Sequence, residues 1–165
     1  MSLRNKILFT DKISNIRVIK AITQVADSEN LKVFAVGGFV RDLILGREKN
    51  DLDVLVIGSG VDFAQSVAEK LGITNVNYFK NFGTAHFDYD NMNIEFVGAR
   101  KESYDRNTRK PIVEDGTFED DITRRDFTIN TLAISLNKSD FGKLIDNCSG
   151  FTDIENKLIK TPLDP

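Results

Sequence analysis

The chain has 165 residues, 41% of them hydrophobic and 28% charged, which is enough for one domain with a real core. Its formal net charge of −3 argues against a protein that coats nucleic acid by bulk positive charge, so any contact with RNA must be local. The one cysteine, Cys148, excludes an intramolecular disulfide and a cysteine-rich zinc site, and it fits a reducing compartment.

The sequence contains no recognisable targeting or membrane segment. No apolar run approaches the roughly 20 residues needed to span a bilayer, and the N-terminus lacks the apolar core of a signal peptide. We therefore expect a cytoplasmic protein with no membrane partner.

The first predicted element is a helix from Asp11 to Leu31. Its apolar residues recur at helical spacing, and Asp11 is suited to cap its N-terminal end. We interpret it as a packing helix whose charged face meets water.

The stretch from Phe34 to Gly58 predicts a strand, a glycine turn, a short helix, a polar loop and a second strand. In the turn, Gly37 and Gly38 lack side chains, which lets the backbone approach a ligand closely. The helix Phe39 to Leu45 follows at once, and the amides at a helix N-terminus favour an anion such as phosphate.

Two aspartates open the second strand of this unit, Asp51 to Ile57. Because strand side chains alternate, Asp51 and Asp53 lie on one face. Two like charges so close repel unless a cation lies between them, and hard oxygen ligands favour Mg²⁺ over zinc or copper. The alternative is a solvated strand entrance without a metal.

The next segments predict a helix from Val61 to Leu71, a short strand from Val76 to Phe79, and a hairpin that turns at residues 90–92. His86 in the hairpin is the only histidine, and we interpret it as a structural or surface residue. Glu95 interrupts an apolar strand that could lie beside the strand of the two aspartates. The alternative for Glu95 is an outward position on an edge strand.

The segment from Arg100 to Gly116 is polar and predicts a mobile loop. Its basic residues are Arg100, Lys101, Arg106, Arg109 and Lys110. A solvated loop and a flexible loop at the mouth of a site are both compatible with this composition.

A further helix is predicted from Phe118 to Leu136, with acidic residues at its start. On a helix, Asp126 and Asn130 share a face, whereas the adjacent Arg124 and Arg125 point about 100° apart, so only one of the two would face a pocket. A surface arginine pair is the alternative. A short strand from Lys143 to Asp146 and a short helix from Phe151 to Leu158 complete the prediction.

Together these motifs are far more specific than any one of them. The string G-G-x-V-R-D beginning at Gly37, followed by Gly46 and by D-x-D at Asp51, resembles the nucleotidyltransferase superfamily that includes DNA polymerase beta. The segment RRDFTIN, residues 124–130, matches a second signature of the same family. More closely, the chain is similar to the head of bacterial tRNA nucleotidyltransferases, the CCA-adding enzymes of the class shared with bacterial poly(A) polymerases.

This resemblance implies a two-metal site in which Asp51 and Asp53 bind Mg²⁺ and Glu95 is a third catalytic carboxylate. It implies that Arg124 pairs with acids at the start of its helix. We interpret Asp42, on the same short helix as Arg41, as fixing Arg41 or a backbone amide instead of binding metal. The implied nucleotide-binding residues are Gly37, Gly38, Arg41, Arg125 and Asn130.

The implied activity is the addition of CMP and AMP from CTP and ATP to the 3′ end of tRNA, with release of pyrophosphate. A poly(A) polymerase and a non-catalytic nucleotide- or RNA-binding module are the alternatives. The implied fold is α/β, a polymerase-beta-like head with a mixed sheet of about five strands and helices mainly on one face. Residues 1–165 would form this head domain, and we expect the neck, body and tail regions of the family to be absent from the chain.

Overall fold

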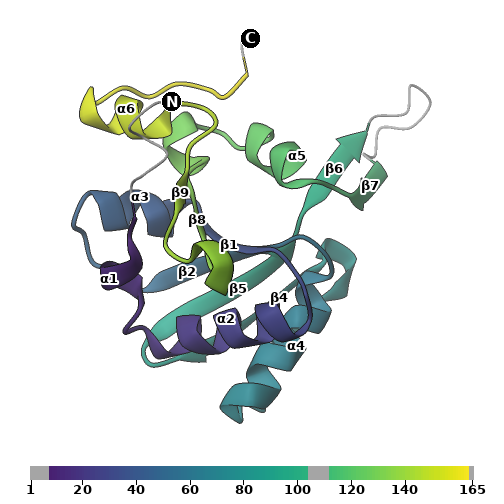
Figure 1. The fold of residues 1–165 in the computed structure, drawn as a ribbon. Helices are drawn as coiled ribbons and strands as arrows, with labels where there is room; N and C mark the ends of the chain where they lie inside the picture. Colours follow the sequence, from purple (N-terminus) through teal and green to yellow (C-terminus); the bar gives the residue numbers. More distant parts are fainter. Residues whose placement is uncertain (1–7, 104–111, 164–165) are drawn as a thin grey trace.

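The computed structural model describes residues 8–103 and 112–163. Its main feature is a seven-stranded sheet in the order β3-β4-β5-β2-β1-β8-β9 (Figure 1). Neighbouring strands are antiparallel except β2 and β5, which run parallel. The predicted α/β class with a mixed sheet is confirmed, with seven strands instead of about five. The strands are β1 Val33–Val36, β2 Asp51–Val56, β3 Asn77–Phe79, β4 Thr84–Tyr89, β5 Met92–Gly98, β8 Ala133–Ser135 and β9 Leu144–Ile145.

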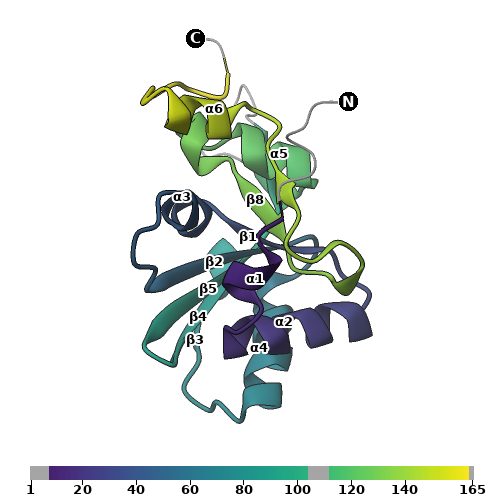
Figure 2. The ribbon, with the colours of Figure 1, turned by 60° about the vertical axis from the view of Figure 1, so that its left-hand side comes forward.

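Two amphipathic helices, α2 (Arg17–Ser28) and α4 (Gly60–Leu71), cover one face of the sheet (Figures 1 and 2). Their apolar stripes, with Ile22 of α2 and Phe63 of α4 both fully buried, join the inward residues of the strands in one core. The helices therefore lie mainly on one face, as expected. Within the described ranges, no helix combines the length and the apolar character that crossing a membrane requires.

The predicted N-terminal helix is interrupted. Helix α1 (Thr10–Ile13) ends at Ile13, and α2 begins only at Arg17, because Ile16 has an extended backbone with φ −78° and ψ 112°. The side chains of Ser and Asn compete with the backbone for hydrogen bonds, so the Ser14-Asn15 pair favours a turn over a helix interior. The continuous helix expected from Asp11 to Leu31 is therefore wrong in its first turns.

The other face of the sheet carries shorter elements. Figure 2 shows α5 (Phe118–Thr123) and α6 (Gly150–Glu155) across the sheet from α2 and α4. The ring of Phe118 packs on that of Phe34, with 4.6 Å between their centroids, in a small second cluster. The chain that connects β1 to β2 forms α3 (Gly38–Ile44), whose start and length agree closely with the predicted short helix.

The polar segment expected to be a loop is partly a two-stranded ribbon. Strand β6 (Arg100–Ser103) pairs antiparallel with β7 (Ile112–Asp115), and the register sets Lys101 opposite Glu114. Opposite charges at facing positions favour such pairing, which explains how a polar sequence forms strands here. The remainder of the segment, with Arg106, Arg109 and Lys110, lies outside the described residues.

The long helix expected from Phe118 to Leu136 is also wrong. Helix α5 ends at Thr123, a 3₁₀ turn (η3, Thr128–Asn130) follows, and the chain then enters strand β8. Tertiary hydrogen bonds override the helical pattern, because β8 pairs with β1 and the amide of Thr128 donates to the carbonyl of Lys160 at 2.9 Å. The RRDFTIN segment is thus a folded connection and not a helical face.

Candidate active site

Carboxylates from two neighbouring strands meet on the sheet face opposite α2 and α4. In β2, Asp51 and Asp53 alternate with the fully buried Leu52 and Val54, which point into the main core. The parallel register sets Asp53 beside Glu95 of β5. The strand of Glu95 therefore is the neighbour of the aspartate strand, and Asp51 and Glu95 are both exposed to solvent.

The electrostatic environment of Asp53 favours a bound cation. Burial raises the pKa of its carboxyl above the ordinary value, and the negative charges of Glu95 and Asp51 raise it further against the opposing effect of Arg125. A positive charge between the carboxylates would remove this cost. The residue types fit Mg²⁺, which prefers carboxylate oxygens.

Within residues 8–103 and 112–163, no group of three or more His, Cys, Asp or Glu side chains forms a ready-made metal cage. Protein Mg²⁺ sites often use one or two carboxylates and complete the shell with water and substrate phosphates. Asp51 and Asp53 fit a site of that open kind. They do not fit a site made of protein ligands alone.

The glycine turn brings a cationic group to the carboxylates. Gly37 has φ +69° and ψ −137°, a backbone conformation that side chains disfavour. A Cβ atom at this position would lie 3.3 Å from Nη1 of Arg125 and 3.5 Å from Oδ2 of Asp53. The absence of a side chain at Gly37 therefore lets the guanidinium of Arg125 and the carboxylate of Asp53 both lie against the turn.

Arg41 of α3 is held in place from two sides. Its Nε donates to Oδ1 of Asp42, and its Nη1 donates to Oδ1 of Asn130, both at 2.9 Å. The expectation that Asp42 fixes Arg41 is confirmed. Asn130 in turn donates to Asp126 at 3.0 Å, and this hydrogen bond is the main cause of the lowered pKa of the Asp126 carboxyl. The two residues thus meet as expected, although through a 3₁₀ turn instead of a helix.

A residue that the sequence analysis did not single out, Asp121, holds both adjacent arginines. Its side chain is fully buried and accepts from Nη2 of Arg124 at 2.7 Å and from Nη2 of Arg125 at 2.9 Å. The expected pairing of Arg124 with an acid at the helix start is confirmed. Nε of Arg125 is buried and has no hydrogen-bond partner within the described residues. Asp121 stands three residues before Arg124 and four before Arg125, and this spacing was the signal available in the sequence. Only its burial distinguishes Asp121 from its acidic neighbours.

A second unanticipated carboxylate, that of Asp153, binds the RRDFTIN segment through Thr128. Asp153 of α6 is buried, accepts from the hydroxyl of Thr128 at 2.7 Å, and lies 3.3 Å from Nζ of Lys160. The Thr128 hydrogen bond and Lys160 lower the pKa of the Asp153 carboxyl, against the opposing effect of burial. This contact ties the segment that carries Arg125 and Asn130 to α6.

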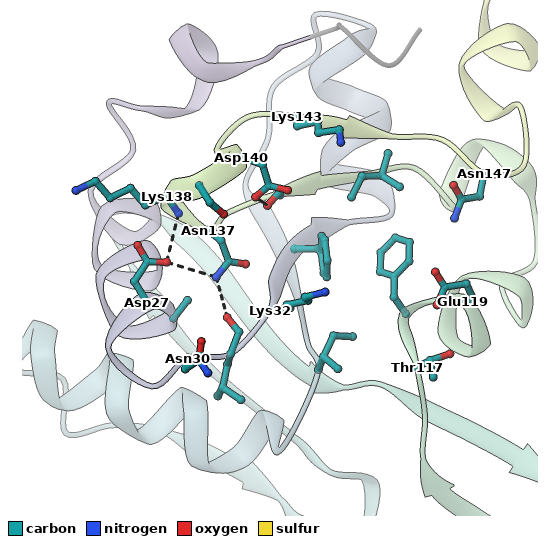
Figure 3. Close-up of a pocket in the computed structure, with 18 of the residues that line it drawn as sticks. Asp27, Asn30, Lys32, Thr117, Glu119, Asn137, Lys138, Asp140, Lys143 and Asn147 are labelled. Carbon is teal, nitrogen blue, oxygen red and sulfur yellow. Dashed lines mark hydrogen bonds between the residues drawn. The ribbon is translucent and has the colours of Figure 1, made fainter. Parts of the chain in front are cut away.

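A large hollow, with a volume of about 1300 Å³, lies elsewhere (Figure 3). It is lined at the N-terminal end of β1 by Lys32 and by Asn137, whose amide donates to the carbonyl of Leu31 at 2.7 Å. Asp27 accepts from the Asn137 amide and from the backbone amide of Lys138 on the same side. None of the predicted site residues lines this hollow, so size alone does not locate the chemistry.

Comparisons with known proteins agree with this geometry. A family model described as the poly A polymerase head domain matches residues 33–160. The chain is 43% identical over 130 residues to the A-adding tRNA nucleotidyltransferase of Aquifex aeolicus (strain VF5), covering 79% of this chain and 16% of that protein. It is 35% identical over 147 residues to the A-adding tRNA nucleotidyltransferase of Halalkalibacterium halodurans, covering 88% of this chain and 34% of that protein.

Solved structures show the same likeness. One is a tRNA nucleotidyltransferase complexed with a primer tRNA and an incoming ATP analog, with a TM-score of 0.75 and 37% identity over 86% of this chain and 39% of that one. A second is the apo form II of a CCA-adding enzyme, with a TM-score of 0.81 and 32% identity over 93% of this chain and 37% of that one. The chain thus spans only a minor part of these relatives, from about a sixth to a little over a third of their length.

Proposed function

The chain belongs to the poly(A) polymerase head-domain family, as its resemblance implied, and from that premise we propose that it transfers CMP or AMP from CTP or ATP to the 3′ end of tRNA. The observation that supports this most directly is the position of Asp53, with Glu95 on one side and the Gly37 turn and Arg125 on the other. A phosphate site and an acid pair meet there on one face of the sheet.

In this proposal Asp51 and Asp53 would hold Mg²⁺, which when bound neutralises phosphate charge and lowers the pKa of an attacking hydroxyl. The open backbone of Gly37 and Gly38 admits the triphosphate. Arg41 and Arg125 then contact its oxygens, since guanidinium groups suit planar bidentate phosphate recognition. The partnerless Nε of Arg125 is one donor available for that contact.

The reaction is an in-line displacement at the α-phosphorus. The 3′-hydroxyl of the RNA gives its proton to solvent, its oxygen forms a bond to phosphorus, and the bond from phosphorus to the bridging oxygen of the β-phosphate breaks. Pyrophosphate leaves with both electrons of that bond. The chain's own residues contribute positioning and electrostatic stabilisation, which are the principal sources of rate in phosphoryl transfer.

Two alternatives remain distinct from this proposal. A poly(A) polymerase would use the same groups, but it would ignore CTP and would not stop after a fixed number of additions. A non-catalytic nucleotide- or RNA-binding module would not need Asp51, Asp53 and Arg125 together, so their joint presence favours an enzyme. The match of residues 33–160 to the head-domain model supports treating the chain, residues 1–165, as the catalytic head domain of such an enzyme. A free Cys148 suits a reducing compartment such as the cytoplasm.

Calorimetric titration of the protein with CTP and with ATP tests the proposal, with and without Mg²⁺. Binding that needs Mg²⁺ and weakens in both Asp51→Asn and Arg125→Ala is the expected result. The matched control is Glu69→Gln, an exposed acid on α4 across the sheet, which should bind like the parent. Metal-independent binding, or equal binding by all variants, would reject the site. If the site holds, extension of a tRNA 3′ end by the protein distinguishes CTP use from ATP use alone.

A further inference from the structure

The sheet face that carries the carboxylates continues past them to the edge of the sheet. The strand registers set Asp53 beside Glu95, Glu95 beside His86 of β4, and His86 beside Asn77 of the edge strand β3. Facing residues in neighbouring strands share a face. His86 is therefore the next side chain after Glu95 in a row that begins at the proposed metal site.

The row ends in exposed aromatic surface. The ring of Phe79, two residues beyond Asn77 on the same face of β3, stacks on the imidazole of His86 with 5.5 Å between centroids and 11° between planes. Phe79 is 47% exposed, and Phe82 in the following 3₁₀ turn (η2, Lys80–Phe82) is 64% exposed. In contrast, Phe87 and Phe96 of the adjoining strands point to the other face and are buried.

The position of the proposed phosphate-binding groups indicates from which side of the reaction centre the RNA approaches. The Gly37 turn directly follows β1, and Arg125 lies beside that turn, so both lie on the β1 side of Asp53. In an in-line displacement the attacking oxygen approaches opposite the leaving group. The hydroxyl therefore approaches from the β5 side, where Glu95, His86 and Phe79 follow one another.

We propose that Phe79 and His86 form a stacking platform for the terminal bases of the RNA that accepts the nucleotide. This inference rests on the proposed function and adds the binding subsite of the acceptor strand. Every base offers a flat face to a stacked ring, so the platform suits 3′ ends of differing sequence. Lys80, directly after Phe79, provides a positive charge for the RNA backbone in a chain of net charge −3.

The test uses an RNA stem with an unpaired 3′ end whose last base is 2-aminopurine, a base whose fluorescence falls when it stacks. The protein should quench this fluorescence on binding. Phe79→Leu and His86→Leu should each lose most of the quenching and raise the KM for the RNA by about tenfold. Phe79→Trp keeps an aromatic ring, so it should retain the parental quenching and the parental KM for the RNA. The KM for the nucleotide should stay unchanged in all three variants.

Tyr78→Leu is the matched control, because Tyr78 is a neighbouring exposed aromatic of the same strand whose partner, Ala85, points to the opposite face. It should leave quenching and the RNA KM at the parental values. Parental quenching and RNA KM in folded Phe79→Leu and His86→Leu would overturn the platform, and so would an equal loss in Tyr78→Leu. Failure of the proposed function is separate: the unsubstituted protein would then incorporate no nucleotide, whatever its quenching.

Discussion

The buried carboxylate of Asp121 orients the guanidinium of Arg125 toward the glycine turn. Oδ2 of Asp121 accepts from Nη2 of Arg125 at 2.9 Å, while Nη1 of the same arginine lies 3.3 Å from the place of a Cβ on Gly37. One end of the guanidinium is thus fixed in the protein, and the other faces the proposed phosphate site. Preorganisation of this kind avoids ordering the side chain at the moment of binding.

Replacing Asp121 with Asn should therefore affect both stability and binding. Breaking a buried ion pair costs about 3–5 kcal/mol, and we expect the lower end because the Arg124 side chain is 36% exposed. The nucleotide Kd should rise by about tenfold, equivalent to about 1.4 kcal/mol. Urea unfolding and calorimetry measure the two effects. Glu119→Gln, an exposed acid of the same helix, should change neither, and a parental Kd in folded Asp121→Asn would contradict the role.

The sequence predicted correctly that Asp51 and Asp53 share one face of a strand, because the local pattern of residues determines it. Strand β2 alternates acid and apolar residues, so the face of Asp51 and Asp53 follows from periodicity alone. Its partner Glu95 needed the family resemblance, because the register between β2 and β5 joins residues about forty positions apart. No local rule reports such pairing.

The wrong helix from Phe118 to Leu136 and the two missed carboxylates have a common physical cause. The segment from Phe118 to Leu136 has helical spacing, yet β8 exists because β1 offers an unpaired edge to it. Likewise, the roles of Asp121 and Asp153 depend on burial, which is a property of the assembled fold. Acidic residues in a run look alike in sequence, and packing alone selects the one that becomes a buried partner.

Gly37→Ala should weaken nucleotide binding beyond its effect on stability. The added methyl group would meet Arg125 and Asp53 at 3.3 and 3.5 Å, in a backbone conformation that costs about 1–3 kcal/mol for a residue with a side chain. Gly46→Ala is the matched control, since Gly46 also has positive φ, +67°, but a Cβ there meets nothing within 4 Å. Both variants should melt earlier, and only Gly37→Ala should lose binding. Equal Kd values in the two would refute the argument.

Thr128→Val should destabilise the fold by about 1–3 kcal/mol, because it removes a donor from the buried Asp153 carboxylate while keeping the side-chain shape. Since the pKa of Asp153 is lowered in the fold, this contribution is present above the ordinary aspartate pKa and is lost as the pH falls through the folded value. The deficit measured by denaturant unfolding should thus be larger at pH 7 than at pH 3.

The neighbouring Thr152 of α6 supplies the control for this substitution. Its hydroxyl is buried without a hydrogen-bond partner within the described residues, so Thr152→Val should cost little or should stabilise the protein. A similar loss of stability in both valine variants would mean that the Thr128 hydroxyl has no special role in holding the RRDFTIN segment.

Asp53→Asn should stabilise the metal-free protein at neutral pH while abolishing the proposed nucleotidyl transfer. The folded pKa of Asp53 is raised, chiefly by burial and next by Glu95, so ionising this carboxyl costs more in the folded state than in the unfolded state. The cost is absent below the ordinary aspartate pKa of about 3.9 and is incurred as the pH rises through the folded value. The variant should therefore melt above the parent at pH 7 in EDTA, and the two melting temperatures should converge in acid. Adding Mg²⁺ should raise the melting temperature of the parent and leave that of the variant unchanged. A variant that melts below the parent at pH 7 without metal would show that the site is already neutralised by the chain's own cations, Arg125 among them, and that no metal is needed to relieve it.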